Sequence, residues 1–409
     1  MRLRFAFALA ALALAYAPIA AAQTAPTPQQ RARIERILTR TPLIDGHNDL
    51  PDQIREHYGG DLDRVDLTTD TRLLPTPLHT DIPRLRQGRV GAQFWSVYVP
   101  ADLQGAASAE AVSVQIDLVR QIIARHPTVF EFANSADDIV RIHRRGRIAS
   151  MLGMEGGEAI NDNLAILRSF RRQGVLYMTL CHGRTTSWVD SATDAPRHGG
   201  LSPFGEEVVR EMNRIGMLVD LSHVSADAMR DALSVSRAPV IFSHSSAFAL
   251  VPHPRNVPDD VLRLVHENGG VVMVNFYPGF ISEGVRQWAA AQAGEAARQK
   301  ALHPDDPAAA SAALEAWATA HPRPAASVAQ IADHIEHIRD VAGVENVGIG
   351  GDFDGVPYLP ADLEGVDAYP EIFAELMRRG WSDADLSLLA GGNLLRALRA
   401  AERISARER

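Results

Sequence analysis

The segment Leu43-Ile44-Asp45-Gly46-His47-Asn48-Asp49 decides the fold, because it is a short apolar run that stops on His and Asp residues. Five other apolar runs also stop on a His, Asp or Glu, at residues 151–155, 176–182, 217–223, 240–244 and 347–352. Two further runs, 93–99 and 271–276, lack the charged end and bring the number of expected strands to about eight. Parallel strands that are buried on both faces have this nearly continuous apolar character.

Helical stretches alternate with these runs, at residues 112–124, 164–173, 205–215, 226–234, 259–267, 328–341 and 369–379. Alternation at this count predicts an α/β fold, a (β/α)8 TIM barrel. An open doubly wound sheet is the alternative, but the strand ends lack Gly-rich phosphate loops. In a barrel the functional side chains gather where the strands end, so the His and carboxylate residues are expected to share one mouth.

The chain is expected to form one catalytic domain over residues 31–405, after two N-terminal segments. Residues 1–22 have the layout of a secretory signal peptide, with early arginines, an apolar stretch and a small-residue end. We therefore expect an exported protein, periplasmic or secreted, with no stable membrane anchor. Residues 23–30 are rich in Pro, Gln and Thr and are expected to be a disordered lead-in.

Two later segments modify the barrel pattern. Residues 284–326 are Ala-rich, contain four prolines and separate the seventh strand from the helix before the last strand. They are expected to form a helical insertion, or a lid over the barrel. A final helix is expected from the Ser382 cap to about Arg403, weakened by Gly391 and Gly392 inside it.

The overall composition excludes some functions. The formal net charge of −9 at pH 7 argues against a nucleic-acid-binding surface. Cys181 is the only cysteine, so no internal disulfide can form. It lies inside an apolar run, where a buried inert thiol is expected rather than a nucleophile.

The charged strand ends predict a metal site. His47 and Asp49 are two residues apart, so they project to the same side of a strand and can converge on one ion. Equivalent strand ends supply four further ligand-type residues, which are Glu155, His182, His223 and His244. So many ligand-type residues at one barrel mouth indicate that the mouth binds metal.

The same residues suggest two ions rather than one. Two-metal hydrolases hold their ions about 3.5–4 Å apart, and an anionic ligand must screen the repulsion between them. Some barrel hydrolases use a carboxylated lysine, but the only lysine here, Lys300, lies in the Ala-rich segment. Glu155 is therefore the candidate bridge between two Zn²⁺ ions, and a single-metal site remains the alternative.

Asp352 and Arg255 are candidates for the remaining chemistry. Asp352 ends the last strand, so it is either another ligand or the base that handles the proton of a metal-bound water. Arg255 lies in the loop after the sixth strand, where its guanidinium could clamp a substrate carboxylate. A surface ion pair is the alternative for Arg255, and turn capping is the alternative for Asp352.

Several motifs together resemble the membrane dipeptidase (renal dipeptidase) family. They occur in the family's order between about residues 42 and 400, and they comprise His47-Asn48-Asp49-Leu50-Pro51 and residues 91–96, 155–157, 220–223, 242–246, 255–260 and 351–355. The resemblance implies that His47 and Asp49 bind one zinc, that His223 and His244 bind the other, and that Glu155 bridges them.

It also implies that His182 and Arg255 contact the substrate and that Asp352 acts at the bridging water. The expected reaction is hydrolysis of dipeptides by a metal-bridging hydroxide, including dipeptides with a C-terminal D-residue. Asp352, His182 and Glu155 would then be catalytic, and His182, Arg255 and Asp352 would contact substrate. A related metal-dependent amidase or lactonase is the alternative.

The chain departs from animal members of the family in two respects. It lacks their disulfides and C-terminal lipid-anchor signal, so nothing supports a covalent dimer, although the resemblance permits a non-covalent homodimer. Its 284–326 segment is also longer than the corresponding connection in the animal enzymes, which makes transfer of their substrate preference unsafe.

Overall fold

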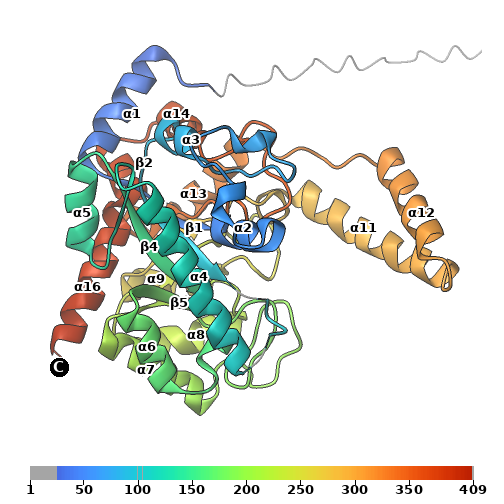
Figure 1. Cartoon of the computed structure of the whole chain (residues 1–409), viewed down its shortest axis with the longest axis horizontal. Helices are drawn as coiled ribbons and strands as arrows, with labels where there is room; N and C mark the ends of the chain where they lie inside the picture. The colour runs from blue at the N-terminus through green and yellow to red at the C-terminus, as the bar shows by residue number, and fades with distance from the viewer. Residues whose placement is uncertain (1–24, 99, 104, 408–409) are drawn as a thin grey trace, which may run out of the picture.

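The computed structural model describes residues 25–98, 100–103 and 105–407, which form a parallel β/α barrel surrounded by helices (Figure 1). The predicted signal peptide, residues 1–22, lies outside the described residues. The barrel strands are β1 Leu43–Asn48, β2 Val90–Tyr98, β4 Ile148–Glu155, β5 Val175–Thr179, β6 Leu218–Asp220, β7 Ile241–Phe242, β8 Val271–Val274 and β9 Val347–Ile349.

Parallel pairing closes these eight strands into a ring. The order runs β2-β1-β9-β8-β7-β6-β5-β4, and β2 also pairs with β4, from Ala92 opposite Ala149 to Tyr98 opposite Glu155. The predicted TIM barrel is confirmed. A short strand that the sequence pattern did not predict, β3 Phe130–Phe132, pairs with the first residues of β4.

Helices cover the outside of the ring. Their bounds are α1 Pro28–Arg40, α2 Leu50–Tyr58, α3 Ile82–Gln87, α4 Ala106–Arg125, α5 Ala136–Arg144, α6 Leu164–Arg172, α7 Pro203–Ile215, α8 Ala226–Val235, α9 Asp259–Asn268, α10 Pro278–Ile281, α11 Glu283–Leu302, α12 Pro307–Ala320, α13 Val328–Ala342, α14 Tyr369–Arg378, α15 Asp383–Ser387 and α16 Asn393–Arg407. Within the described residues, no helix combines the length and apolarity needed to cross a bilayer.

Helix α1 begins earlier than the sequence suggested. Thr27 accepts a hydrogen bond from the Gln30 backbone, and the Gln30 side chain accepts one from the Thr27 backbone. This capping box, with Pro28 at the first helical position, starts the helix within the expected disordered lead-in. Residues 28–30 are therefore helical.

Apolar side chains fill and close the end of the barrel where the strands begin. Residues early in the strands, such as Ala92, Ala149 and Ile241, form one buried cluster with Leu394 and Leu398 of α16. The C-terminal helix thus covers the end of the barrel where the strands begin. The opposite end, where the strands stop, is left for the polar residues.

The predicted single C-terminal helix is interrupted. Ser382 and Asp385 form the predicted capping box, but a π-helical segment, Leu388–Gly392, separates α15 from α16. A Cβ atom on Gly391 would collide with the carbonyl oxygen of Pro42 and would lie 2.6 Å from Cγ1 of Ile44. The glycine therefore permits the close approach of this segment to β1.

We expect Gly391→Ala to lower the free energy of unfolding by about 1–3 kcal/mol, the usual cost of overpacking. Thermal or urea unfolding measures the change. Gly294→Ala is the matched control, because a Cβ atom at this position in α11 meets nothing within 4 Å. If both variants have the same stability, the proposed close packing against β1 is wrong.

The Ala-rich insertion forms a hairpin of α11 and α12 that extends away from the barrel (Figure 1). At its base, the Trp288 indole donates a hydrogen bond of 2.6 Å to the carbonyl of His321, and the Trp288 and Trp317 rings are 6.1 Å apart. The predicted helical insertion is confirmed. The alternative of a lid does not hold, because the helices project outward.

Candidate active site

The candidate residues lie where the barrel strands end. His47 is near the end of β1, and Asp49 is the residue before α2. Glu155 is the last residue of β4, and its neighbour on β2 is Tyr98. His223, His244 and Asp352 follow β6, β7 and β9 by two or three residues. Because the strands are parallel, their ends bring these side chains to the same mouth.

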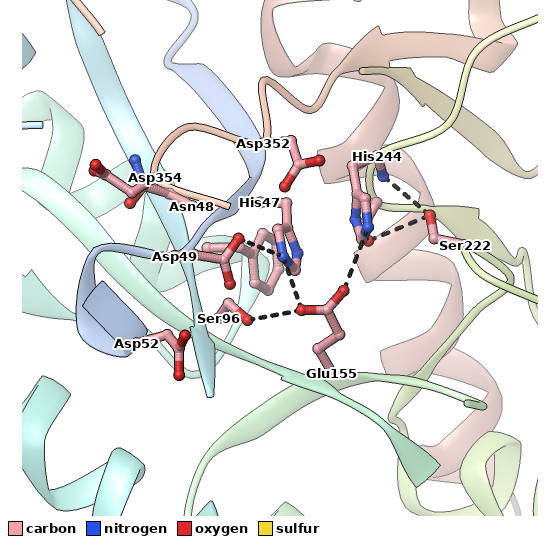
Figure 2. A network of polar contacts seen from close by, with 12 residues as sticks. His47, Asn48, Asp49, Asp52, Ser96, Glu155, Ser222, His244, Asp352 and Asp354 are labelled. Atoms are coloured by element: carbon pink, nitrogen blue, oxygen red, sulfur yellow. Dashed lines mark hydrogen bonds and ion pairs between the residues drawn. The ribbon is translucent and has the colours of Figure 1, made fainter. Parts of the chain in front are cut away.

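Glu155 links the His47 side and the His244 side of the cluster (Figure 2). Its Oε2 is 3.2 Å from Nε2 of His47, and Nε2 of His47 is 3.1 Å from Oδ2 of Asp49. Its Oε1 is 2.9 Å from Nε2 of His223 and 3.4 Å from Nε2 of His244. The two oxygens of one carboxylate therefore face two different groups of ligand-type atoms.

The buried polar atoms of the cluster are arranged to bind a metal ion rather than to hydrogen-bond with one another. His47 Nε2 is buried and has no hydrogen-bond partner. The Nε2 atoms of His223 and His244 are 2.9 Å apart. Three sets of ligand atoms each lie within 4.8 Å of one another: His47, Glu155 and His244; Glu155, His182 and His223; His47, Asp49 and Asp352. Such sets of imidazole and carboxylate donors suit divalent cations such as zinc.

Hydrogen bonds behind the cluster orient two of the imidazoles. The Tyr177 hydroxyl donates to the carbonyl of Gly46, so it accepts from Nδ1 of His47 at 2.9 Å. Ser243 donates to Asp220 at 2.6 Å and therefore accepts from Nδ1 of His244 at 2.7 Å. Each ring then directs its Nε2 toward the cluster, an orientation that outer partners commonly give to metal-binding histidines.

The electrostatics of the cluster keep most of its groups in their metal-binding forms. Burial lowers the pKa of His223 and His244 well below the usual value, so both rings are neutral. Burial would raise the pKa of Glu155, but the positive charge of His47 and a hydrogen bond from His223 lower it well below the usual range. Glu155 is therefore an anion, with the neutral rings of His223 and His244 on one side and the charged ring of His47 on the other.

His182 lies at the edge of the cluster. Its Nε2 is 3.9 Å from Oε1 of Glu155, and its ring packs 4.3 Å from that of His223 and 4.8 Å from that of Tyr98. Burial lowers the pKa of His182, so the ring is neutral and can donate one hydrogen bond. Its side chain is 28% exposed, whereas that of Glu155 is 6% exposed, which leaves His182 accessible to a ligand.

Asp352 approaches the cluster from the side opposite Glu155 (Figure 2). Its Oδ2 accepts a 2.8 Å hydrogen bond from the Asn275 side chain. Burial, supported by the charges of Asp49 and Glu155, raises the pKa of Asp352 to about 8. Its backbone φ is +59° and that of His223 is +70°, so two candidate residues adopt the left-handed conformation that is costly for non-glycine residues.

Arg255 is buried at the mouth, with 3% of its surface exposed. Its guanidinium donates 3.3 Å hydrogen bonds to Oγ of Ser245 and to the carbonyl of His244, and it lies over the Phe280 ring. The alternative of a surface ion pair is therefore wrong. Arg255 lines the same cavity as the cluster.

A cavity of about 380 Å³ connects these groups to solvent. Its lining contains every candidate site residue except His47, which lies deeper. The lining also contains residues that the sequence reasoning missed: Asp52, Gln53, Glu56, Tyr98, Tyr277, Phe280, Gly355, Val356 and Pro357. Asp52 follows Asp49 by one helical turn, a spacing that could have identified it.

A parallel barrel with a buried His and carboxylate cluster at its C-terminal face defines the class of barrel metallohydrolases. The family model described as "Membrane dipeptidase (Peptidase family M19)" matches residues 31–409. The chain belongs to this family of metallopeptidases, which confirms the resemblance seen in the sequence. It is accordingly a hydrolase that acts on peptide bonds.

Individual relatives agree with the family match. The chain is 41% identical over 377 residues to "Dipeptidase tcpJ" of Claviceps purpurea, covering 89% of this chain and 78% of that protein. It is 39% identical to "Dipeptidase 3" of Rattus norvegicus, covering 92% and 68%. The fold is similar to that of the probable dipeptidase PvdM from Pseudomonas aeruginosa, with a TM-score of 0.78, 24% identity and coverage of 92% and 100%.

A metallopeptidase from Rhodobacter sphaeroides also shares the fold, with a TM-score of 0.69, 22% identity and coverage of 88% of this chain and 99% of that one. Its crystal structure contains a phosphinate mimic of the dipeptide L-Ala-D-Ala. At this level of identity, the likeness supports the barrel fold alone.

Proposed function

We propose that the protein is a dizinc dipeptidase in which Glu155 bridges the two ions. The observation that carries the proposal is the position of the Glu155 carboxylate, with Oε2 toward His47 and Oε1 toward His223 and His244. His47 and Asp49 would hold one ion, and His223 and His244 the other. The ions would polarise the scissile carbonyl and supply a water-derived nucleophile near neutral pH.

Two residues of the chain would carry out the remaining catalytic roles. His182, a neutral and partly exposed imidazole, would donate a hydrogen bond to the carbonyl oxygen as negative charge develops there. Asp352, held by Asn275, would take the proton of the attacking water and pass it to the departing amine.

Arg255 would bind the C-terminal carboxylate of the substrate. Its buried guanidinium borders the cavity beside His244, so a bound carboxylate would fix the adjacent peptide bond over Glu155. A longer peptide would place a different bond there, which explains a restriction to dipeptides. We include C-terminal D-residues in the proposal, since the related Rhodobacter enzyme binds a mimic of L-Ala-D-Ala.

Zinc analysis and a substrate panel test this proposal. We expect about two zinc ions per chain, hydrolysis of L,L and L,D dipeptides, and no hydrolysis of tripeptides or of dipeptide amides that lack the carboxylate. Chelation should abolish activity, and zinc should restore it. Equal turnover of the dipeptide amides, or of simple lactones, would favour a different hydrolase.

We expect Arg255→Ala to raise KM for dipeptides by roughly 10- to 100-fold, the equivalent of a lost charge-assisted hydrogen bond, with a smaller change in kcat. Arg255→Lys keeps the positive charge but not the forked geometry of the guanidinium. Its KM should therefore lie between that of the wild type and that of Arg255→Ala. Steady-state kinetics measure both. The assignment is wrong if KM is unchanged while kcat falls.

We also propose that the protein is exported. The support is the N-terminal pattern of Arg2 and Arg4, an apolar stretch from Phe5 and the residues Ala20 to Ala22. Fractionation of cells that produce the full chain, with N-terminal sequencing of the mature protein, tests this. We expect the mature protein to begin near Gln23.

A further inference from the structure

The cavity has two electrostatically different walls. Arg255 lies on the His244 side, where it donates to the His244 carbonyl. The opposite wall is formed by α2 and contains Asp49, Asp52 and Glu56. In Figure 2, Asp52 lies beyond Asp49, on the side away from His244. A ligand that spans the cavity therefore meets a cation at one end and carboxylates at the other.

The spacing along α2 places these carboxylates on one face. Asp49, Asp52 and Glu56 are separated by three and four residues, so their side chains lie one above another on the helix. At 1.5 Å per residue, Asp52 and Glu56 lie about 4.5 Å and about 10 Å along the axis from Asp49. The acidic wall thus runs from the metal-binding cluster outward along the cavity.

Asp52 has one carboxylate oxygen that makes no hydrogen bond to a described residue. Only 6% of its surface is exposed, yet it lines the cavity. Its Oδ1 accepts hydrogen bonds from Arg55, the shorter at 2.6 Å, and from Gln115 at 3.3 Å. Among the described residues, Oδ2 has no hydrogen-bond partner. Because Asp52 lines the cavity, this oxygen is available to pair with a cationic ligand there.

We propose that the α2 wall is the subsite for the N-terminal residue of the substrate, where Asp52 and Glu56 bind positive charge. The inference rests on the proposed dipeptidase function. A dipeptide whose carboxylate is held by Arg255 and whose peptide bond lies over Glu155 must direct its N-terminal residue away from His244, toward α2. The charge is carried by the α-ammonium group, within reach of Asp52, or by a basic side chain, long enough to reach Glu56.

Two substrate pairs distinguish these sources. Ala-Ala and propionyl-Ala share the scissile bond and differ in the α-ammonium group. Lys-Ala and norleucyl-Ala differ in the side-chain charge. For each pair, the readout is the ratio of kcat/KM for the cationic member to that for the neutral member. We expect wild-type ratios above one, and we expect Asp52→Asn or Glu56→Gln to lower at least one of them about 10-fold.

Two further variants serve as controls. Arg55→Lys keeps a positive charge beside Oδ1 of Asp52 and leaves the carboxylate itself, so it should keep both ratios. Glu110→Gln removes an exposed carboxylate from α4, outside the cavity lining, and should change neither. If Arg55→Lys lowers the ratios as Asp52→Asn does, the effect is structural and the inference is wrong.

The remaining outcomes distinguish failure of the subsite proposal from failure of the dipeptidase proposal. Ratios that are the same in wild type, Asp52→Asn and Glu56→Gln overturn the subsite while leaving the dipeptidase proposal intact. A zinc-loaded wild-type protein that hydrolyses no dipeptide overturns both.

Discussion

Replacing Glu155 with glutamine is expected to remove the metal ions and the activity together. The substitution keeps the size of the side chain but removes the negative charge that lies between His47 and the His223–His244 pair. Without this anion, two cations in the same cluster would repel each other unscreened. We expect zinc content to fall from about two ions per chain to one or fewer, and kcat/KM to fall by at least about 10³-fold.

Glu158→Gln is the matched control. Glu158 is a neighbouring buried carboxyl group, neither of its oxygens has a hydrogen-bond partner, and burial raises its pKa to about 7. It belongs to none of the three sets of candidate ligands. This variant should retain its zinc. A Glu155→Gln protein that binds two zinc ions with wild-type affinity would contradict the bridging role.

Asp352→Asn is expected to lower kcat by about 10²- to 10⁴-fold, the usual contribution of general acid–base catalysis, with zinc content retained. Asparagine occupies the same volume and can still pair with Asn275, but it cannot accept a proton from water and return it to the leaving amine. Single-turnover kinetics on the metal-loaded variant, compared with its KM, would show whether the chemical step is the one that slows.

Asp354→Asn separates this effect from a change in loop structure. Asp354 accepts a 2.7 Å hydrogen bond from the backbone of His79 and lies outside the cavity lining. Its substitution should lower the thermal stability of the protein and change kcat little. Full turnover by the metal-replete Asp352→Asn variant would show that another group moves the proton.

The fold could be predicted because each barrel strand is buried on both faces and therefore appears in the sequence as a continuous apolar run. The convergence of His47, Glu155, His223 and His244 followed from the same pattern, because the ends of parallel strands meet at one face. The direction of the α11–α12 hairpin could not be predicted, since alanine-rich helices are compatible with packing on the barrel or extending from it.

Other features depend on tertiary contacts that produce no periodic pattern in the sequence. Tyr177 lies within an apolar strand, and only the folded barrel shows that its hydroxyl orients His47. The break at Gly391 arises from contact with Pro42 and Ile44, which are distant in the sequence. The role of Asp52 in the cavity could have been anticipated from its spacing to Asp49, but its free oxygen could not.

The most direct test of a Glu155-bridged pair of ions is anomalous diffraction at the zinc edge from crystals of the zinc-loaded protein. We predict two anomalous peaks about 3.5–4 Å apart, one beside each oxygen of the Glu155 carboxylate. A single peak, or zinc bound away from Glu155, would contradict the account.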